Sequence, residues 1–199
     1  MGMEVSPTFT PGRRSEWRRW LEAHHAVEAV VWVLVDRAWR PGAPPRPGGL
    51  TYLDVVEECL CFGWIDGLAK THEGLFAQRT TPRRRGGNWT ELNKERCRRL
   101  IAAGRMTPAG RAALPDLDAP WAAPPPVLEA LRADPAAWAR WVDFPPIYQR
   151  VRAGYVAEVE RRDPAEYARR LASLLEKTRA GVMFGNWDDA GLPVTPTDR

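Results

Sequence analysis

The sequence predicts an α+β fold that is predominantly helical, with a small antiparallel β-sheet packed against helices and a C-terminal helical segment. Three observations lead to this prediction. The run "VEAVVWVLV" is short, apolar and rich in β-branched residues, which is typical of a buried strand. Two further apolar stretches, joined by "THEG", indicate a β-hairpin. In most other segments the apolar residues recur three and four positions apart, as on one face of a helix.

The N-terminal part begins with an irregular segment, a helix and a strand. Pro, Thr and Gly are frequent in residues 1–13, which we expect to be a loop. A helix is predicted over 15–24 because Ser15 is a good N-cap and the apolar residues after it share a face. The β-branched residues that follow predict a buried strand over 28–35. The Pro- and Gly-rich residues 40–49 predict a loop.

The middle of the chain predicts a helix that runs into the hairpin. Thr51 opens this helix, expected over 51–62, and Asp54 three residues later suits a capping box. Gly63 is able to end the helix in a left-handed conformation. The hairpin that follows has its strands at 64–71 and 75–81.

The clearest helix of the chain follows a basic loop. Thr90 is the expected N-cap of a helix over 90–104, and Trp89 before it is placed to pack on the first turns. Gly104 ends the helix. Pro108 then occupies the first position of a short additional helix.

These elements suggest two structured parts. We expect an N-terminal α+β core over 1–114, a Pro/Ala linker over 115–126, a C-terminal helical module over 127–185 and a flexible tail over 186–199. The helices of the C-terminal module are predicted at about 127–133, 135–143, 145–161 and 164–179.

The composition is that of an ordinary globular protein. Of the 199 residues, 44% are hydrophobic and 27% are charged. The net charge of +4 comes from 29 basic and 25 acidic residues that are interleaved along the chain, which gives nucleic-acid binding little support. No apolar run is long enough to cross a bilayer, and the N-terminus lacks the apolar stretch of a signal peptide. We therefore expect a cytoplasmic protein with no membrane partner.

The three cysteines, Cys59, Cys61 and Cys97, argue against a disulfide framework. Without a neighbouring His or Cys cluster, the C-x-C spacing does not predict a metal site, and the chain has none of the common nucleotide-binding or hydrolase motifs. We expect no metal and no cofactor. Cys61 lies on the apolar stripe of its helix and is interpreted as a small buried hydrophobe, with a nucleophile paired to His72 as the alternative.

The segment "CFGWIDG" at 61–67 places one carboxylate in an apolar setting. Asp66 lies between Ile65 and Gly67 at the start of the hairpin. If it is desolvated beside Trp64, its raised pKa would suit a general acid or base. Two structural alternatives are that it accepts backbone N–H bonds in the turn, or that it pairs with Arg79 or Arg83 on the partner strand.

A second group of polar residues surrounds the start of the helix at 90–104. Arginines precede that start, where unpaired N–H groups and the helix dipole favour an anion. Asparagine side chains add donors and Trp89 adds a flat face. We therefore predict one pocket formed by the hairpin start and the basic loop. The residues predicted to line it are Trp64, Asp66, Arg79, Arg83, Asn88, Trp89, Asn93 and Arg96.

Several motifs resemble the YdeI/OmpD-associated family, also described as bacteriocin-protection proteins. They are "EECLCFGWIDG", "QRTTPRR" and "NWTELNKERCRRLIAAGRMTPAGRAAL". The resemblance is specific over about residues 16–114 and looser in the C-terminal part, where Tyr155 and Val156 replace the usual Trp-Ile pair. It implies a small soluble bacterial protein, and the family name implies a role in protection against toxins or stress.

Three functions remain open at the level of sequence. The first is binding of a small anionic or aromatic molecule in the predicted pocket, in a stress-, toxin- or antibiotic-protection role. The second is a small enzyme that uses Asp66 as a general acid or base in an Arg- and Trp-lined pocket. The third is weak nucleic-acid binding through the arginine loop at 83–85.

Overall fold

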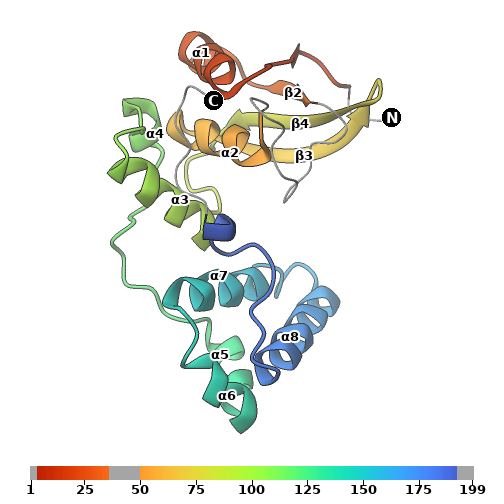
Figure 1. The fold of residues 1–199 in the computed structure, drawn as a ribbon, viewed down its shortest axis with the longest axis vertical. Coiled ribbons are helices and arrows are strands. Elements are labelled where there is room, and N and C mark those ends of the chain that lie inside the picture. Colours follow the sequence, from red (N-terminus) through yellow and green to blue (C-terminus); the bar gives the residue numbers. More distant parts are fainter. Residues whose placement is uncertain (1–3, 36–49, 192–199) are drawn as a thin grey trace. The chain divides into compact units, whose positions relative to one another are not determined.

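The structure is a computed structural model that describes residues 4–35 and 50–191 (Figure 1). The chain divides into two compact units. The first comprises the described residues of Met1–Asn88 and Arg96–Leu117, and the second comprises those of Trp89–Glu95 and Asp118–Leu192. The predicted loop at 40–49 and most of the predicted tail lie outside the described residues.

A four-stranded sheet forms the centre of the first unit. Its order is β1 (Thr8–Phe9), β2 (Val31–Val35), β4 (Leu75–Pro82) and β3 (Trp64–His72). β2 pairs antiparallel with β4, and β4 with β3, so the predicted hairpin is confirmed. The expected antiparallel sheet is mixed, because Thr8–Phe9, inside the segment expected to be a loop, form β1. β1 joins β2 in parallel, because the amide of Trp32 donates to the carbonyl of Pro7 at 2.8 Å.

Helices α1 (Arg14–His24) and α2 (Tyr52–Cys61) belong to this unit, and α2 packs against β3 and α1 (Figure 1). The capping box of α2 is present: Thr51 accepts from the Asp54 amide, and Asp54 accepts from the Thr51 amide at 2.8 Å. Gly63 ends α2 with a φ of +73°. These local signals therefore predicted the helix ends correctly.

A short helix, α4 (Pro108–Ala112), is held against the end of α2. Thr107 caps α4, and its hydroxyl also donates to the carbonyl of Cys61 at 2.5 Å. Gly110 allows the close approach, because a Cβ at this position would lie 2.1 Å from the Cys61 carbonyl oxygen. The turn at 61–67 is thereby fixed from the side of α4.

Helix α3 (Glu91–Ala102) contributes residues to both units, which divide after Glu95. Its N-cap is Thr90, as predicted, whose hydroxyl accepts from the Asn93 amide at 3.2 Å. In the second unit, Glu95 forms an ion pair with Arg150 at 3.7 Å.

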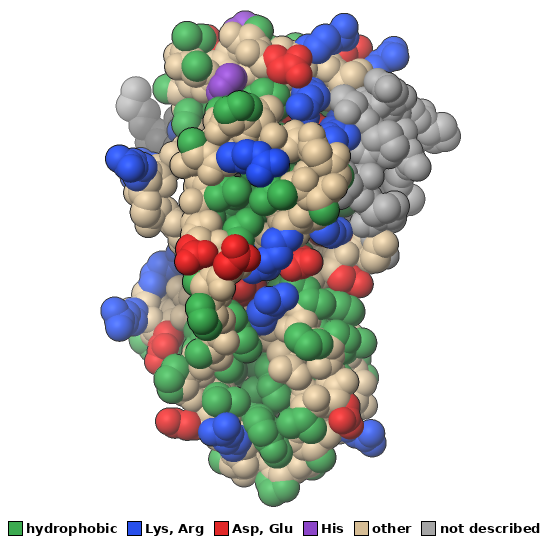
Figure 2. All heavy atoms as spheres, turned by 90° about the vertical axis from the view of Figure 1, so that its left-hand side faces the viewer, with side chains coloured by type: hydrophobic (Ala, Val, Ile, Leu, Met, Phe, Trp, Pro, Cys, Tyr) green, Lys and Arg blue, Asp and Glu red, His purple; other side chains and the backbone are tan. Residues whose placement is uncertain are grey.

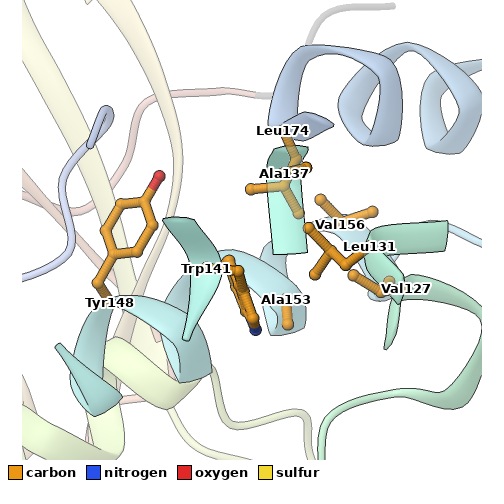
Figure 3. Close-up of a cluster of buried hydrophobic side chains, with 8 residues drawn as sticks. All are labelled: Val127, Leu131, Ala137, Trp141, Tyr148, Ala153, Val156 and Leu174. Atoms are coloured by element: carbon orange, nitrogen blue, oxygen red, sulfur yellow. The ribbon is translucent and has the colours of Figure 1, made fainter. Parts of the chain in front are cut away.

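The second unit is otherwise built from helices and a short 3-10 turn. They are α5 (Pro125–Arg132), α6 (Pro135–Trp141), α7 (Pro146–Ala157), α8 (Pro164–Arg179) and η1 (Asp189–Gly191). Pro occupies an early position of each of these four α-helices, where its missing N–H costs nothing. Their buried residues form one apolar cluster (Figure 3). Across residues 4–35 and 50–191, every helix falls short of the length and apolar character that a membrane span requires.

Candidate functional site

The start of β3 places Asp66 beside the core of the first unit. Trp64 is buried, its indole N–H donates to the His25 carbonyl at 3.1 Å, and its ring meets Trp20 edge-on. Asp66, two residues further, is only partly buried and lies opposite Thr80 in the register of β3 and β4. Trp64 is therefore part of the core in this structure, and its predicted place in the lining of the pocket would require it to leave these contacts.

Tyr52 is the direct partner of Asp66. Its hydroxyl donates to Oδ2 of Asp66 at 2.6 Å. Burial raises the pKa of Tyr52 well above its usual value, and the negative charge of Asp66 raises it further. The phenol is therefore protonated and acts as a donor. Oδ1 of Asp66 accepts no hydrogen bond from any residue that the structure describes, so one carboxylate oxygen can accept from a ligand.

A β-bulge lies directly after Asp66. The pairing of β3 with β4 shifts between Asp66 and Ala69, and the Gln78 side chain donates to the Gly67 carbonyl at 2.9 Å inside this irregularity. A bulge changes the direction of the strand and of its neighbouring side chains. It is part of what sets the orientation of Asp66.

Arg83 supplies positive charge near Asp66. Its Nη1 donates to the Asn88 carbonyl at 3.2 Å, and its backbone N–H donates to the Gly63 carbonyl. Burial lowers the pKa of Arg83, while Cys97 and Asp66 act in the opposite direction. Arg96, also in the first unit, is buried and close enough to Tyr52 to lower the pKa of its phenol. Asp66, Tyr52, Arg83 and Arg96 are called the Asp66 cluster below.

Arg79 lies elsewhere. It neighbours Thr80 on β4, and successive side chains of a strand point to opposite faces. Since Asp66 faces Thr80 across the two strands, the Arg79 side chain lies on the other face of the sheet. The predicted alternative of an Asp66–Arg79 pair is therefore wrong. None of the described arginines forms an ion pair with Asp66.

The remaining predicted residues are divided between the units. Asn88 belongs to the first and contacts Arg83 through its carbonyl, whereas Trp89 and Asn93 belong to the second. Their part in a common pocket with Asp66 stays a prediction. Tyr52 was absent from the sequence prediction. The signal for it was faint: a tyrosine at the first position of a capped helix, fourteen residues before Asp66.

The cysteines are not arranged for nucleophilic catalysis. All three are free and buried. Burial raises the pKa of Cys61 and that of Cys97 to about 12, so both are thiols near neutral pH. This agrees with the interpretation of Cys61 as a buried hydrophobe. Within the part of the chain that the structure describes, no group of His, Cys, Asp or Glu has the arrangement of a metal site.

The arginines of the loop at 83–85, which were proposed for nucleic-acid binding, do not all face solvent. Arg83 is partly buried, whereas Arg84 and Arg85 are exposed. Basic and acidic side chains are interspersed on the face shown in Figure 2. Phosphate-backbone binding depends on a concentration of positive charge, which this face does not present.

A buried ion network that the sequence analysis did not anticipate joins α1 to α2. Arg14, 1% exposed, donates to Glu58 at 2.5 Å, to Glu57 at 2.7 Å and to Asp54 at 3.1 Å. Arg18 and Arg105 also donate to Glu58. The neighbouring carboxylates raise the pKa of Arg14 despite its burial, which alone would lower it. We interpret this network as structural, because its arginines and carboxylates form ion pairs with one another.

Comparisons with protein families divide the chain in two. Residues 9–113 match a family described as Domain of unknown function (DUF8412). Residues 122–181 match the family described as Bacteriocin-protection, YdeI or OmpD-Associated. The suspected resemblance is thus confirmed over residues 122–181, less than half of the chain, whereas the motifs at 16–114, where the resemblance was expected to be specific, fall within the DUF8412 match. Neither a curated protein nor a solved structure matches the chain.

Proposed function

Because the chain belongs to the DUF8412 family, whose function is unknown, and carries a YdeI/OmpD-associated segment, we propose a function from the geometry of the Asp66 cluster. The protein binds a small anionic or aromatic molecule there. The name of the second family suggests that this binding serves protection against a toxin, an antibiotic or another stress.

One observation carries the proposal: Asp66 is held by Tyr52 through one oxygen and offers the other. A partly buried carboxylate whose second oxygen accepts nothing from the described chain suits an N–H or O–H donor of a ligand. Arg83 and Arg96 add the positive charge that an anionic group on the same ligand requires. The Tyr52 hydroxyl fixes the direction of the free oxygen, so the site is prepared before the ligand arrives.

A thermal-shift screen of the full chain against anionic metabolites and aromatic antibiotics tests this proposal. At a hundredfold excess over Kd, a bound compound is expected to raise the Tm by roughly 5 to 10 °C. Asp66→Asn should lose most of this shift, because the amide has only one oxygen and so cannot accept hydrogen bonds from both Tyr52 and a ligand as the two carboxylate oxygens can. Asp143→Asn, at an exposed site of the second unit, should keep it. A well-folded protein that no compound stabilises would contradict the proposal.

Acid–base catalysis by Asp66 is the second candidate function. The observation in its favour is that no described arginine neutralises Asp66 in an ion pair, so the carboxylate is available for proton transfer. Turnover of any stabilising compound, followed by mass spectrometry and abolished in Asp66→Asn, would support the enzyme. Stable binding without a change in the mass of the compound would support the binding protein.

A further inference from the structure

We propose that Arg152, in the second unit, anchors a second site, which binds a small molecule through an oxyanion, either a carboxylate or a phosphate group. Arg152 lies on α7 and is 7% exposed. It forms no ion pair and no hydrogen bond with any residue in the described part of the chain, and its Nε is fully buried without a partner. A guanidinium group withdrawn from water carries a large desolvation cost unless an anion meets it.

Arg14 is a buried arginine with a structural role and can be compared with Arg152. Three carboxylates of α2, those of Asp54, Glu57 and Glu58, surround its guanidinium group. Arg152 has no such set. Burial lowers the pKa of Arg152, and the nearby positive charge of Arg170 lowers it further. The comparison indicates that the counter-charge of Arg152 comes from outside the described chain.

Two acidic residues of this unit, Glu158 and Glu166, pair with Arg170, which lies beside the same aromatic ring as Arg152. Arg170 donates to Glu166 at 2.7 Å and to Glu158 at 3.0 Å. Its guanidinium carbon lies 3.8 Å from the centre of the Tyr155 ring, and that of Arg152 lies 4.7 Å from the same centre. One of the two cations beside Tyr155 is thus neutralised within the fold, while the other is left for an external anion.

Aromatic rings and a glycine hold the Arg152 side chain in place. The Phe184 ring centre is 4.1 Å from the guanidinium carbon, in addition to the contact with Tyr155. Gly185 has a φ of +72°, and a Cβ there would lie 2.5 Å from Nη1 of Arg152. The backbone therefore passes directly against the guanidinium group. This arrangement prepares one geometry of Arg152 before an anion binds.

The terminal nitrogens of the Arg152 guanidinium group remain accessible to solvent. Nε is the one nitrogen of Arg152 that is both sealed from solvent and unpartnered, so the two terminal nitrogens keep contact with solvent. Two N–H-bearing terminal nitrogens in one plane match the two oxygens of a carboxylate or phosphate. Tyr155 is 40% exposed, so its ring gives an adjacent surface for an apolar part of the ligand.

Tyr148 offers a second donor one turn before Arg152. Its hydroxyl is buried without a hydrogen-bond partner; the Phe184 amide is near it but does not have the geometry of a hydrogen bond. Burial raises the pKa of Tyr148, so the phenol keeps its proton. Figure 3 shows Tyr148 at the edge of the apolar cluster of the second unit. Its hydroxyl therefore has no hydrogen-bond partner within the described chain and is able to donate to a ligand.

Isothermal titration calorimetry of the full chain with inorganic phosphate and with benzoate, at matched ionic strength, tests this site. We expect saturable binding of at least one probe in wild type. In Arg152→Gln the affinity should fall by about tenfold or more, whereas Arg161→Gln, which removes an exposed charge from the same unit, should change it by less than about twofold. Preference for phosphate would indicate a phosphorylated ligand, and preference for benzoate an aromatic carboxylate.

A spectroscopic measurement keeps the test valid if Arg152→Gln does not fold. The Nε–H signal of Arg152 is expected to be visible by ¹⁵N NMR because the atom is buried, and Arg152→Lys, which keeps a cation against the rings, serves to assign it. The signal should shift saturably with the probe that binds. An unchanged signal throughout the titration, absence of saturable binding of either probe at millimolar concentrations, or wild-type affinity in Arg152→Gln would each overturn the proposal.

Discussion

The Tyr52 hydroxyl donates a 2.6 Å hydrogen bond to Oδ2 of Asp66 and thereby ties the first residue of α2 to the third residue of β3. This contact is formed across fourteen residues of sequence, and it orients the carboxylate on which the proposed function depends. A hydrogen bond to a charged group contributes more to stability than one between neutral groups.

We predict that Tyr52 and Asp66 are energetically coupled. In a double-mutant cycle of Tyr52→Phe and Asp66→Asn, the free energies of unfolding should be non-additive, with a coupling of about 1 kcal/mol. Urea denaturation of the wild type, the two single variants and the double variant gives this value. Additive effects would show that the two side chains do not interact in solution.

The ionisation of Tyr52 should give the protein a distinct alkaline response. Its pKa is raised in the folded state, mainly by burial and then by Asp66, while the unfolded chain titrates near the ordinary value of about 10. The contribution of protonated Tyr52 to the free energy of unfolding is therefore fully present below about pH 10. It is lost as the pH rises above this value, because the unfolded chain then releases the proton while the folded chain keeps it. Phenolate absorbance should show one late-titrating tyrosine fewer in Tyr52→Phe. Loss of a normally titrating tyrosine instead would contradict the contact with Asp66.

The network around Glu58 should be sensitive to loss of one carboxylate. Glu58→Gln leaves Arg14, Arg18 and Arg105 facing a neutral amide, and breaking a buried ion pair in this way costs about 3 to 5 kcal/mol. Glu22→Gln is the matched control: Glu22 also pairs with Arg18, but it is 52% exposed, so its loss should cost less than about 1 kcal/mol. Chemical denaturation measures both. If Glu58→Gln and Glu22→Gln lowered the free energy of unfolding equally, the buried network would stabilise the protein no more than an exposed ion pair does.

Two helical glycines provide a matched test of the packing of α4 on α2. Gly→Ala in a helix is normally favourable by roughly 0.5 to 1 kcal/mol. At Gly154 of α7 an added Cβ meets its nearest atom at an ordinary 3.6 Å, so Gly154→Ala should be neutral or stabilising. At Gly110 it would lie 2.1 Å from the Cys61 carbonyl oxygen, so Gly110→Ala should lower the free energy of unfolding by about 1 to 3 kcal/mol or more. A stabilised Gly110→Ala protein would rule out this close contact.

Local signals in the sequence were sufficient for many elements of the fold. The Thr51–Asp54 capping box, the left-handed Gly63 and the Thr90 cap depend on residues within a few positions of one another, and each is present as predicted. β1 was missed because its two residues carry no periodic pattern. Its pairing with β2 depends on contacts more than twenty residues apart.

The site was harder to predict for the same reason. Sequence reasoning selected Asp66 and Arg83 but not Tyr52, whose proximity to Asp66 arises only when α2 packs on the sheet. It also grouped Arg79 with Asp66, although the register of β3 and β4 directs the two side chains to opposite faces. The buried Arg14 and Arg152 carry no sequence signal that distinguishes them from the many exposed arginines of this chain.

A crystal of the protein soaked with the compound that raises its Tm most would show directly whether a ligand binds at Asp66. We expect a donor atom of the compound about 3 Å from Oδ1 of Asp66, with the Tyr52 hydroxyl still on Oδ2. A compound bound without contact to Asp66, or an Asp66 carboxylate that has turned away to pair with one of the protein's own arginines, would contradict this expectation.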